Sequence, residues 1–181
     1  MEILVDTKQK EGKHTYKHNQ LERRGCTLIH QNLDHGDYML LAGRVSIDTK
    51  RNVAEIWGNL KGSHKNKLGR RVSNYPRFRR ECIRADEADH VLVVLVENRL
   101  GIHNLTELSV YKEPERGTKR RHAKKPINGA ELVKQMNTIS KEYGVLWAFC
   151  HPAQTGDKII EYITREDELL AHKKKVMVNN G

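Results

Sequence analysis

Two aspartates flank a short hairpin that the sequence predicts near the N-terminus. A strand expected over 38–41 and a strand expected over 44–48 are joined by a tight turn at 42–43. Asp37 precedes the first strand, and Asp48 ends the second. In such a hairpin the start of one strand lies beside the end of its partner, so we expect the two carboxylates to lie within reach of each other.

Lys50 follows Asp48 by two positions, and because strand side chains alternate, it is expected on the same side of the sheet. Two carboxylates, together with a main-chain carbonyl of Thr49 between them, form the oxygen-rich environment that Mg²⁺ or Mn²⁺ prefers. Asp6 ends the predicted first strand and adds a third acid. The ammonium group of Lys50 could orient or deprotonate a water, and the metal could stabilise a pentacovalent phosphate.

Each acid alone has an ordinary structural explanation. Asp37 follows Gly36, a typical turn position, and Asp48 could end a strand or cap a helix. The acids gather at one predicted sheet end in a basic protein, which favours a functional reason for the combination.

Basic residues form a second feature. The segment 61–75 is rich in Lys and Arg without apolar periodicity, and we expect it to be a long basic loop; a second basic segment covers 112–126. Such residues bind nucleic-acid phosphates without reading sequence, although a solvated loop is the alternative for either segment. The residues expected to bind nucleic acid are Lys8, Arg51, Lys65, Lys67, Arg70, Arg71, Arg77 and Arg80.

The composition fits this expectation. The chain has 181 residues, with 33 Lys or Arg against 23 Asp or Glu, which gives a formal net charge of +10 and favours a polyanionic partner.

We expect a single domain over 1–175 with a frayed tail at 176–181. The longest apolar run, 91–96, is far shorter than the roughly 20 residues of a membrane-spanning helix. The N-terminus lacks the pattern of a secretory leader, and the three separated cysteines predict neither disulfides nor a zinc site.

The order of elements predicts the fold class. Strands cluster in the first half, whereas strands and helices alternate later, which favours an α/β fold with a mixed β-sheet flanked by helices on both faces. The later expected elements are helices over 52–60, 76–88, 129–143 and 155–173 and strands over 90–97 and 145–150, after an early helix over 19–24.

Several segments, taken in order, resemble the nuclease domain of the XPF family of structure-specific endonucleases, within the PD-(D/E)xK restriction-endonuclease-like superfamily. These segments are Ile3-Leu4-Val5-Asp6-Thr7, Gly36-Asp37-Tyr38, Val45-Ser46-Ile47-Asp48-Thr49-Lys50, Arg77-Phe78-Arg79-Arg80-Glu81-Cys82 before Val91-Leu92-Val93-Val94-Leu95-Val96-Glu97, and Gly144-Val145-Leu146-Trp147-Ala148-Phe149-Cys150. The similarity covers most of 1–164, and its general layout is closer to that of small stand-alone phage and bacterial members.

The resemblance implies a restriction-endonuclease-like fold and a metal site formed by Asp6, Asp37 and Asp48, with Lys50 as the catalytic lysine. It also implies a downstream acid, which appears as Glu55. This sequence departs from the family pattern at 8–9, where Lys-Gln replaces Arg-Glu, and at 48–50, where Asp-Thr-Lys replaces Glu-Arg-Lys.

The sequence therefore predicts an Mg²⁺- or Mn²⁺-dependent DNA endonuclease acting on branched or flapped DNA. The alternatives are a catalytically weak or inactive nucleic-acid-binding module with the same fold, and a basic assembly protein of a phage particle.

We expect DNA as the partner, no membrane and no small-molecule cofactor. The apolar helix faces around 129–164 could serve a homodimer. An intracellular location is expected, in a bacterial or phage-infected cytoplasm or at the nucleoid, with a role in DNA repair or recombination. No helix-hairpin-helix segment is recognised in the sequence, so substrate choice is expected to depend on the basic loops or a partner chain.

Overall fold

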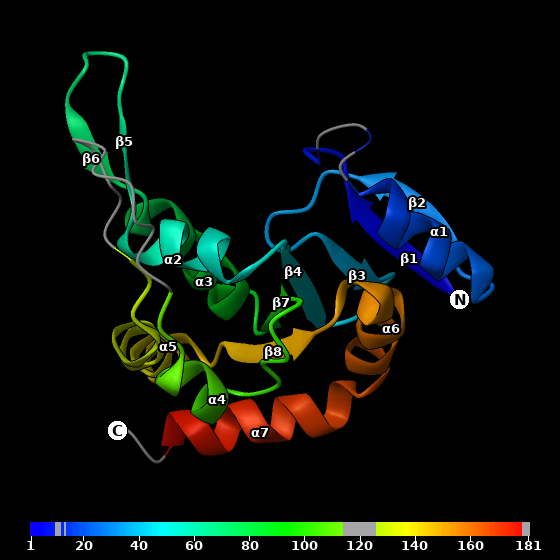
Figure 1. The fold of residues 1–181 in the computed structure, drawn as a ribbon. Helices are drawn as coiled ribbons and strands as arrows, with labels where there is room; N and C mark the ends of the chain where they lie inside the picture. Colours follow the sequence, from blue (N-terminus) through cyan, green and yellow to red (C-terminus); the bar gives the residue numbers. More distant parts are fainter. Residues whose placement is uncertain (10–11, 13, 114–125, 179–181) are drawn as a thin grey trace.

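A six-stranded mixed sheet forms the centre of the computed structural model, which describes residues 1–9, 12, 14–113 and 126–178 (Figure 1). The strand order is β2-β1-β3-β4-β7-β8. The strands are β1 (Glu2–Asp6), β2 (Thr27–Gln31), β3 (Tyr38–Leu40), β4 (Val45–Lys50), β7 (Val91–Glu97) and β8 (Leu146–Cys150). The helices are α1 (Thr15–Arg23), α2 (Val53–Lys61), α3 (Tyr75–Glu87), α4 (Leu105–Val110), α5 (Gly129–Tyr143), the short 3₁₀ turn η1 (Pro152–Gln154), α6 (Thr155–Thr164) and α7 (Glu166–Val178).

The strand directions bring polar strand ends to one edge of the sheet. β3 and β4 form the predicted antiparallel hairpin, in which Tyr38 pairs with Ile47. β4, β7 and β8 are parallel, β1 is parallel to β2, and β1 is antiparallel to β3. The carboxyl ends of β1, β2, β4, β7 and β8 and the amino end of β3 therefore share one edge. We call this the site edge; its polar residues are Asp6, Asp37, Asp48, Thr49, Lys50 and Glu97.

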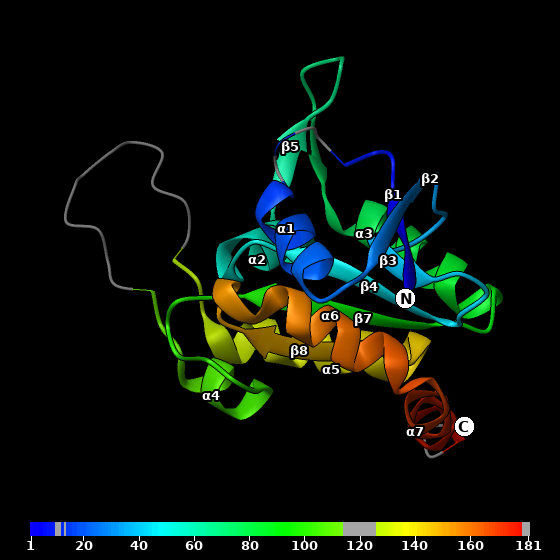
Figure 2. The ribbon, with the colours of Figure 1, turned by 90° about the vertical axis from the view of Figure 1, so that its right-hand side faces the viewer.

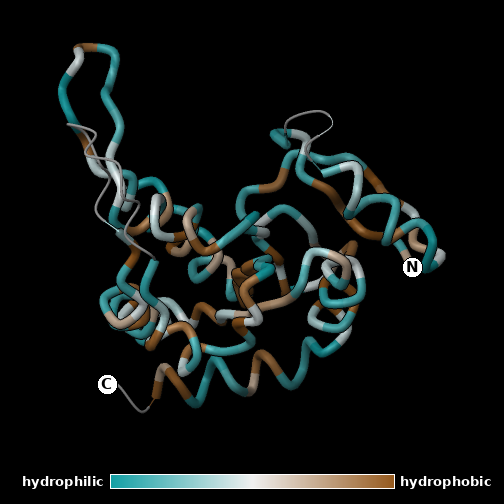
Figure 3. Tube along the Cα trace, viewed as in Figure 1, coloured by the Kyte–Doolittle hydropathy of each residue, from teal (hydrophilic) through white to brown (hydrophobic). Residues whose placement is uncertain are grey.

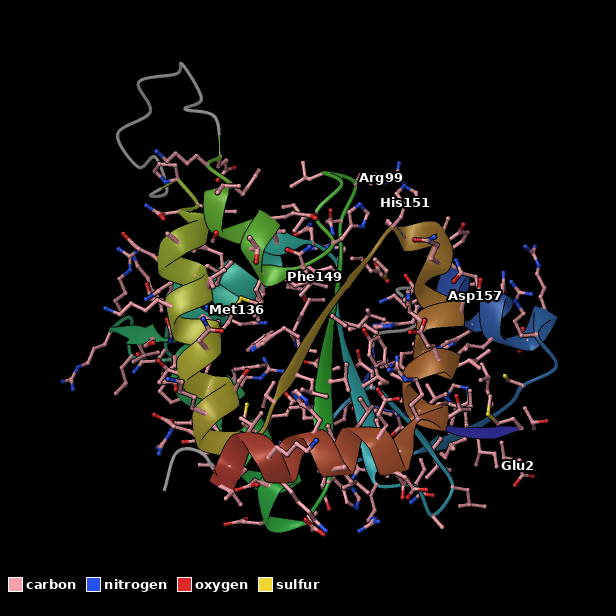
Figure 4. The ribbon with its side chains drawn as sticks, turned by 90° about the horizontal axis from the view of Figure 1, so that it is seen from below. Glu2, Arg99, Met136, Phe149, His151 and Asp157 are labelled. Atoms are coloured by element: carbon pink, nitrogen blue, oxygen red, sulfur yellow. The ribbon has the colours of Figure 1, made fainter. Side chains whose placement is uncertain are left out.

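Helices cover both faces of the sheet, which confirms the predicted fold class. One core lies between the sheet and α2, α3 and α5, and it includes Ile56, Phe78 and Met136. The other lies on the opposite face against α1 and α6 and includes Leu21 and Ile159. Seen from below, α5 with Met136 and α6 with Asp157 lie on either side of the sheet (Figure 4), and α6 runs along the sheet opposite α5 in the side view (Figure 2).

β4 and β7 are buried along their whole length because they are central strands with helices on both faces. The continuous β-branched run of β7 suits this environment. In β4, however, three of the buried side chains are Asp48, Thr49 and Lys50. Burial of charged groups in a central strand requires compensating partners, and these partners define the site described below.

The segment 61–75 is not the long loop that the sequence predicts. It forms a second, two-stranded antiparallel sheet of β5 (Ser63–Lys65) and β6 (Arg71–Ser73), which projects from the body of the protein (Figure 1). Strands of this length cannot display a period-two pattern. The sequence feature that indicates a hairpin here is the pair of turn residues Asn66 and Gly69 between the two strands.

Other boundaries also differ from the expectations. α1 begins at Thr15 rather than near Asn19, the expected helix over 155–173 is divided at Arg165 into α6 and α7, and α4 was not predicted. α7 continues to Val178, past the boundary predicted at 175. The apolar faces of α5 and α6 pack into the two cores of the protein itself, so they do not supply the surface expected for a homodimer. Among the described residues, no helix is both long and apolar enough to cross a membrane.

Candidate active site

The hairpin of β3 and β4 places Asp37 beside the end of β4, as the sequence predicts. The backbone amide of Asp37 donates to the carbonyl of Ile47 over 2.6 Å, immediately before β3 begins. Its carboxylate Oδ2 accepts hydrogen bonds from the amide of Thr49 at 2.8 Å and from the hydroxyl of Thr49 at 2.6 Å. Asp37 is thereby fixed at the site edge, half-buried.

Asp48 and Lys50 form a buried ion pair on the sheet face that carries α3. Strand alternation puts both side chains on this face, and the ammonium group of Lys50 contacts the carboxylate of Asp48. The Nζ atom of Lys50 also lies 5.6 Å from the ring centroid of Phe78 in α3. Only 5% of Asp48 and 8% of Lys50 are exposed, so water contributes little to the solvation of either charge.

Glu81 of α3 adds a carboxylate to this group. Its Oε1 accepts a hydrogen bond from the amide of Gly36 at 3.0 Å, which ties α3 to the loop that carries Asp37. Its charge acts on both Asp48 and Lys50. The sequence segment that carries the resemblance contains Glu81, but only the packing of α3 against β4 shows that it faces the site.

The electrostatics reflect this crowding of carboxylates. Burial raises the pKa of Asp48 well above its usual value; Lys50 opposes this effect, while Glu81 and Asp37 reinforce it. Burial disfavours the charge on Lys50, yet Asp48 and Glu81 outweigh burial and raise the pKa of Lys50. Because an amine is a much stronger base than a carboxylate, we assign the proton to Lys50 at neutral pH, which leaves Asp48 charged.

Asp6 occupies the neighbouring strand end, but its carboxylate is turned toward a different segment. Its Oδ1 accepts a hydrogen bond from the amide of Leu33 at 3.1 Å, while its backbone amide donates to the carbonyl of Asp37 at 3.0 Å. Glu55 serves the start of α2, where it accepts a hydrogen bond from the amide of Arg51 at 2.8 Å. The structure thus brings Asp37, Asp48 and Lys50 together and holds Asp6 at the margin.

A polar network on the opposite sheet face meets the same strand end. The hydroxyl of Thr49 accepts a hydrogen bond from the Nζ atom of Lys17 at 2.9 Å, and Lys17 forms an ion pair with Glu97 at 3.1 Å. The hydroxyl of Thr155 donates to Glu97 over 2.9 Å. The network therefore links α1, β4, β7 and α6, and it holds Thr49 in position for its bond to Asp37. Sequence reasoning missed Lys17 and Glu97, although Glu97 ends the most apolar strand.

The donor types fit a hard divalent cation. The charges of Asp37 and Glu81 both act on Asp48, and carboxylate oxygens are donors that such a cation accepts. In this arrangement the ammonium group of Lys50 stands beside Asp48, where a metal ion would compete with it. No group of three or more His, Cys, Asp or Glu side chains is already arranged around a metal position within the described part of the chain.

The predicted nucleic-acid-binding residues fall into two groups. Lys8 and Arg51 are near the site edge. The Nζ atom of Lys8 donates to the carbonyl of Leu33 at 3.1 Å. The Nε atom of Arg51 lies 3.9 Å from the Oε2 atom of Glu55, and 70% of the Arg51 side chain is exposed. The remaining residues are exposed on β5, β6, their connection and the first turns of α3: Lys65, Lys67, Arg70, Arg71, Arg77 and Arg80. The second basic segment lies mostly outside the described residues.

The order of the mixed sheet and the helices on both of its faces are those of a restriction-endonuclease-like fold. Within that class, the fold is XPF-like. The structure of XPF from Aeropyrum pernix superposes with a TM-score of 0.59 at 16% sequence identity, covering 97% of this chain and 69% of that one. XPF from Aeropyrum pernix in complex with DNA superposes with a TM-score of 0.56 at 17% identity, covering 92% of this chain and 65% of that one. No family model and no curated protein sequence matches the chain.

Proposed function

We propose that the protein is a divalent-metal-dependent DNA endonuclease that hydrolyses phosphodiester bonds in branched or flapped DNA. The observation that carries this proposal is the buried pair of Asp48 and Lys50, with Asp37 and Glu81 acting on it through their charges, at the site edge of an XPF-like sheet. The basic surface supports a DNA substrate, as does the DNA complex formed by XPF from Aeropyrum pernix.

Asp37, Asp48 and Glu81 would hold Mg²⁺ or Mn²⁺, together with the main-chain carbonyl of Thr49. When bound, the ion would supply charge stabilisation at phosphorus and acidify a water molecule. Asp37 is held for this role by both hydrogen bonds from Thr49. Lys50 is held beside Asp48 as a cation whose charge can stabilise the additional negative charge on the attacked phosphate.

A non-catalytic DNA-binding module is the second candidate, and one observation favours it. The Lys50 ammonium group neutralises Asp48, and Thr49 already engages Asp37, so each of these acids has a partner without a metal. On this account the buried charges are structural, and only the basic surface is functional.

Asp37→Asn separates the two candidates. Asparagine keeps an oxygen that can accept both hydrogen bonds from Thr49, so the fold should persist while one metal-binding charge is lost. Asp34→Asn is the matched control, because Asp34 is exposed in the same loop and the charge change is identical.

The assay uses labelled flap, four-way-junction, single-stranded and duplex DNA with Mg²⁺, Mn²⁺ or EDTA. We expect wild-type protein and Asp34→Asn to cut branched DNA only with a divalent ion, and Asp37→Asn to cut at least about 100-fold more slowly with DNA affinity within about threefold. Binding of DNA without cleavage under all metal conditions would support the binding module instead. Absence of DNA binding by the wild type would refute both candidates.

A further inference from the structure

The hairpin arm, residues 63–73, stands away from the body of the protein. Both side views show it projecting beyond the helices (Figures 1 and 2), and every residue of β5 and β6 except Val72 is exposed. At a rise of about 3.3 Å per residue, the arm reaches roughly 15 Å from its base. Because it buries so little, the arm contributes little to the cores, and its side chains are accessible to a partner.

The base of the arm is firmly anchored. The Nδ2 atom of Asn74 donates to the carbonyl of Gly58 at 2.8 Å, and the backbone amide of Asn74 donates to the carbonyl of Gly62 at 3.0 Å. The Oδ1 atom of the same side chain lies 2.7 Å from the ring Nδ1 of His64. One asparagine therefore connects the C-terminal end of α2 to both strands, which fixes the direction of the arm.

The tip is also preorganised, and it presents a leucine. The Oδ1 atom of Asn66 accepts hydrogen bonds from the amide of Leu68 at 3.0 Å and from the amide of Arg70 at 2.9 Å. Gly69, with φ of +73°, supplies the left-handed turn that an L side chain rarely adopts. Leu68 is 77% exposed at this tip, where the hydropathy colouring turns hydrophobic (Figure 3).

Cations surround this leucine on the arm. Lys65 and Arg71 are cross-strand partners, so their side chains share one face of the arm. The Nε atom of Arg71 is held by the hydroxyl of Ser63 at 2.6 Å. Lys67 and Arg70 flank the tip itself. A single exposed leucine is ordinary, but a leucine presented by a closed turn between cations is suited to a partner that is anionic outside and apolar within.

We propose that the hairpin arm is a wedge for duplex DNA, with Leu68 inserting where base stacking is interrupted by a nick, a gap or a junction. This inference rests on the DNA substrate of the proposed function and assigns its structural selectivity to one side chain. The arm's cations contact phosphates on either side, which gives affinity for any duplex. Apolar side chains inserted between base steps are favoured where the stack is already broken, because less unstacking is required.

Leu68→Ala tests the wedge without changing the charge. The matched control is Leu41→Ala, because Leu41 is also an exposed leucine, at 56%, but lies in the β3–β4 turn away from the site edge. Binding is measured in EDTA, to prevent cleavage, on continuous duplex, nicked duplex and a three-way junction of equal length. A 2-aminopurine beside each interruption reports local unstacking.

We expect wild-type protein and Leu41→Ala to prefer interrupted over continuous duplex by roughly tenfold or more and to raise the 2-aminopurine fluorescence, since burial of a leucine side chain supplies this much. Leu68→Ala should bind continuous duplex as the wild type does, yet lose most of the preference and the fluorescence change. An unchanged preference in Leu68→Ala overturns the wedge while leaving the nuclease proposal intact. Failure of the wild type to bind even continuous duplex overturns both, and the two failures are therefore distinguishable.

Discussion

Replacing Asp48 with asparagine should destabilise the protein strongly, because Lys50 would remain buried without its charged partner. The structure gives Lys50 an exposed fraction of only 8%, with Phe78 beneath its ammonium group. Glu81 and Asp37 act on the pair through charge but do not form its direct contact. Breaking a buried pair in this way costs about 3–5 kcal/mol. Since domains of this size are stable by about 5–15 kcal/mol, the variant should still fold at low temperature.

The double variant Asp48→Asn/Lys50→Met distinguishes a buried pair from two independent residues. It removes both charges, so its loss of unfolding free energy should be at least about 2 kcal/mol smaller than the summed losses of Asp48→Asn and Lys50→Met. The free energies of unfolding are measured by urea titration at pH 7.5 and 15 °C in EDTA. Additive single variants, or a loss below about 1 kcal/mol in Asp48→Asn, would refute the assignment of Asp48 and Lys50 as an energetically coupled pair.

Two further predictions concern groups away from that pair. Burial, reinforced by His90, lowers the pKa of His35 from 6.5 to about 4, so the unfolded chain binds a proton that the folded protein resists. Above pH 6.5, His35 is neutral in both states and the folded protein keeps its full stability. As the pH falls from 6.5 toward 4, only the unfolded chain takes up this proton, so the free energy of unfolding falls by about 3 kcal/mol. Urea midpoints across this range should therefore fall less steeply in His35→Asn. Burial also raises the pKa of Cys150 to about 11, so a disulfide-exchange reagent at pH 8 should modify this thiol slowly in the folded protein and rapidly in urea. Fast modification of the folded protein at Cys150, located by peptide mass, would contradict its buried environment.

The sequence predicted the parts of the fold that depend on local pattern. The alternation around Val45 and Ile47 gave the hairpin of β3 and β4, and the β-branched run at 91–97 gave the buried central strand. The placement of Asp48 and Lys50 on the same sheet face followed from strand alternation alone, whereas their ion pair was not predicted. These features depend on neighbours in the chain, which is why a single sequence was sufficient.

Features that depend on packing between distant segments were not predictable in this way. Glu81 reaches the site only because α3 lies across β4, and Lys17 meets Glu97 only because α1 covers the other face. The hairpin arm was not predicted for a different reason. Its strands have no buried face, so the sequence shows no alternation of apolar and polar residues there. Its turn is specified instead by the hydrogen bonds of Asn66 and the conformation of Gly69.

The central claim is that the acids at the site edge bind a divalent cation. Crystals soaked in Mn²⁺ and measured at the manganese absorption edge would test it directly. We expect an anomalous peak about 2.2 Å from carboxylate oxygens of Asp37 and Asp48, with the ammonium group of Lys50 displaced from Asp48. A map without a peak at this position, in which Lys50 still contacts Asp48 at saturating Mn²⁺, would contradict the claim.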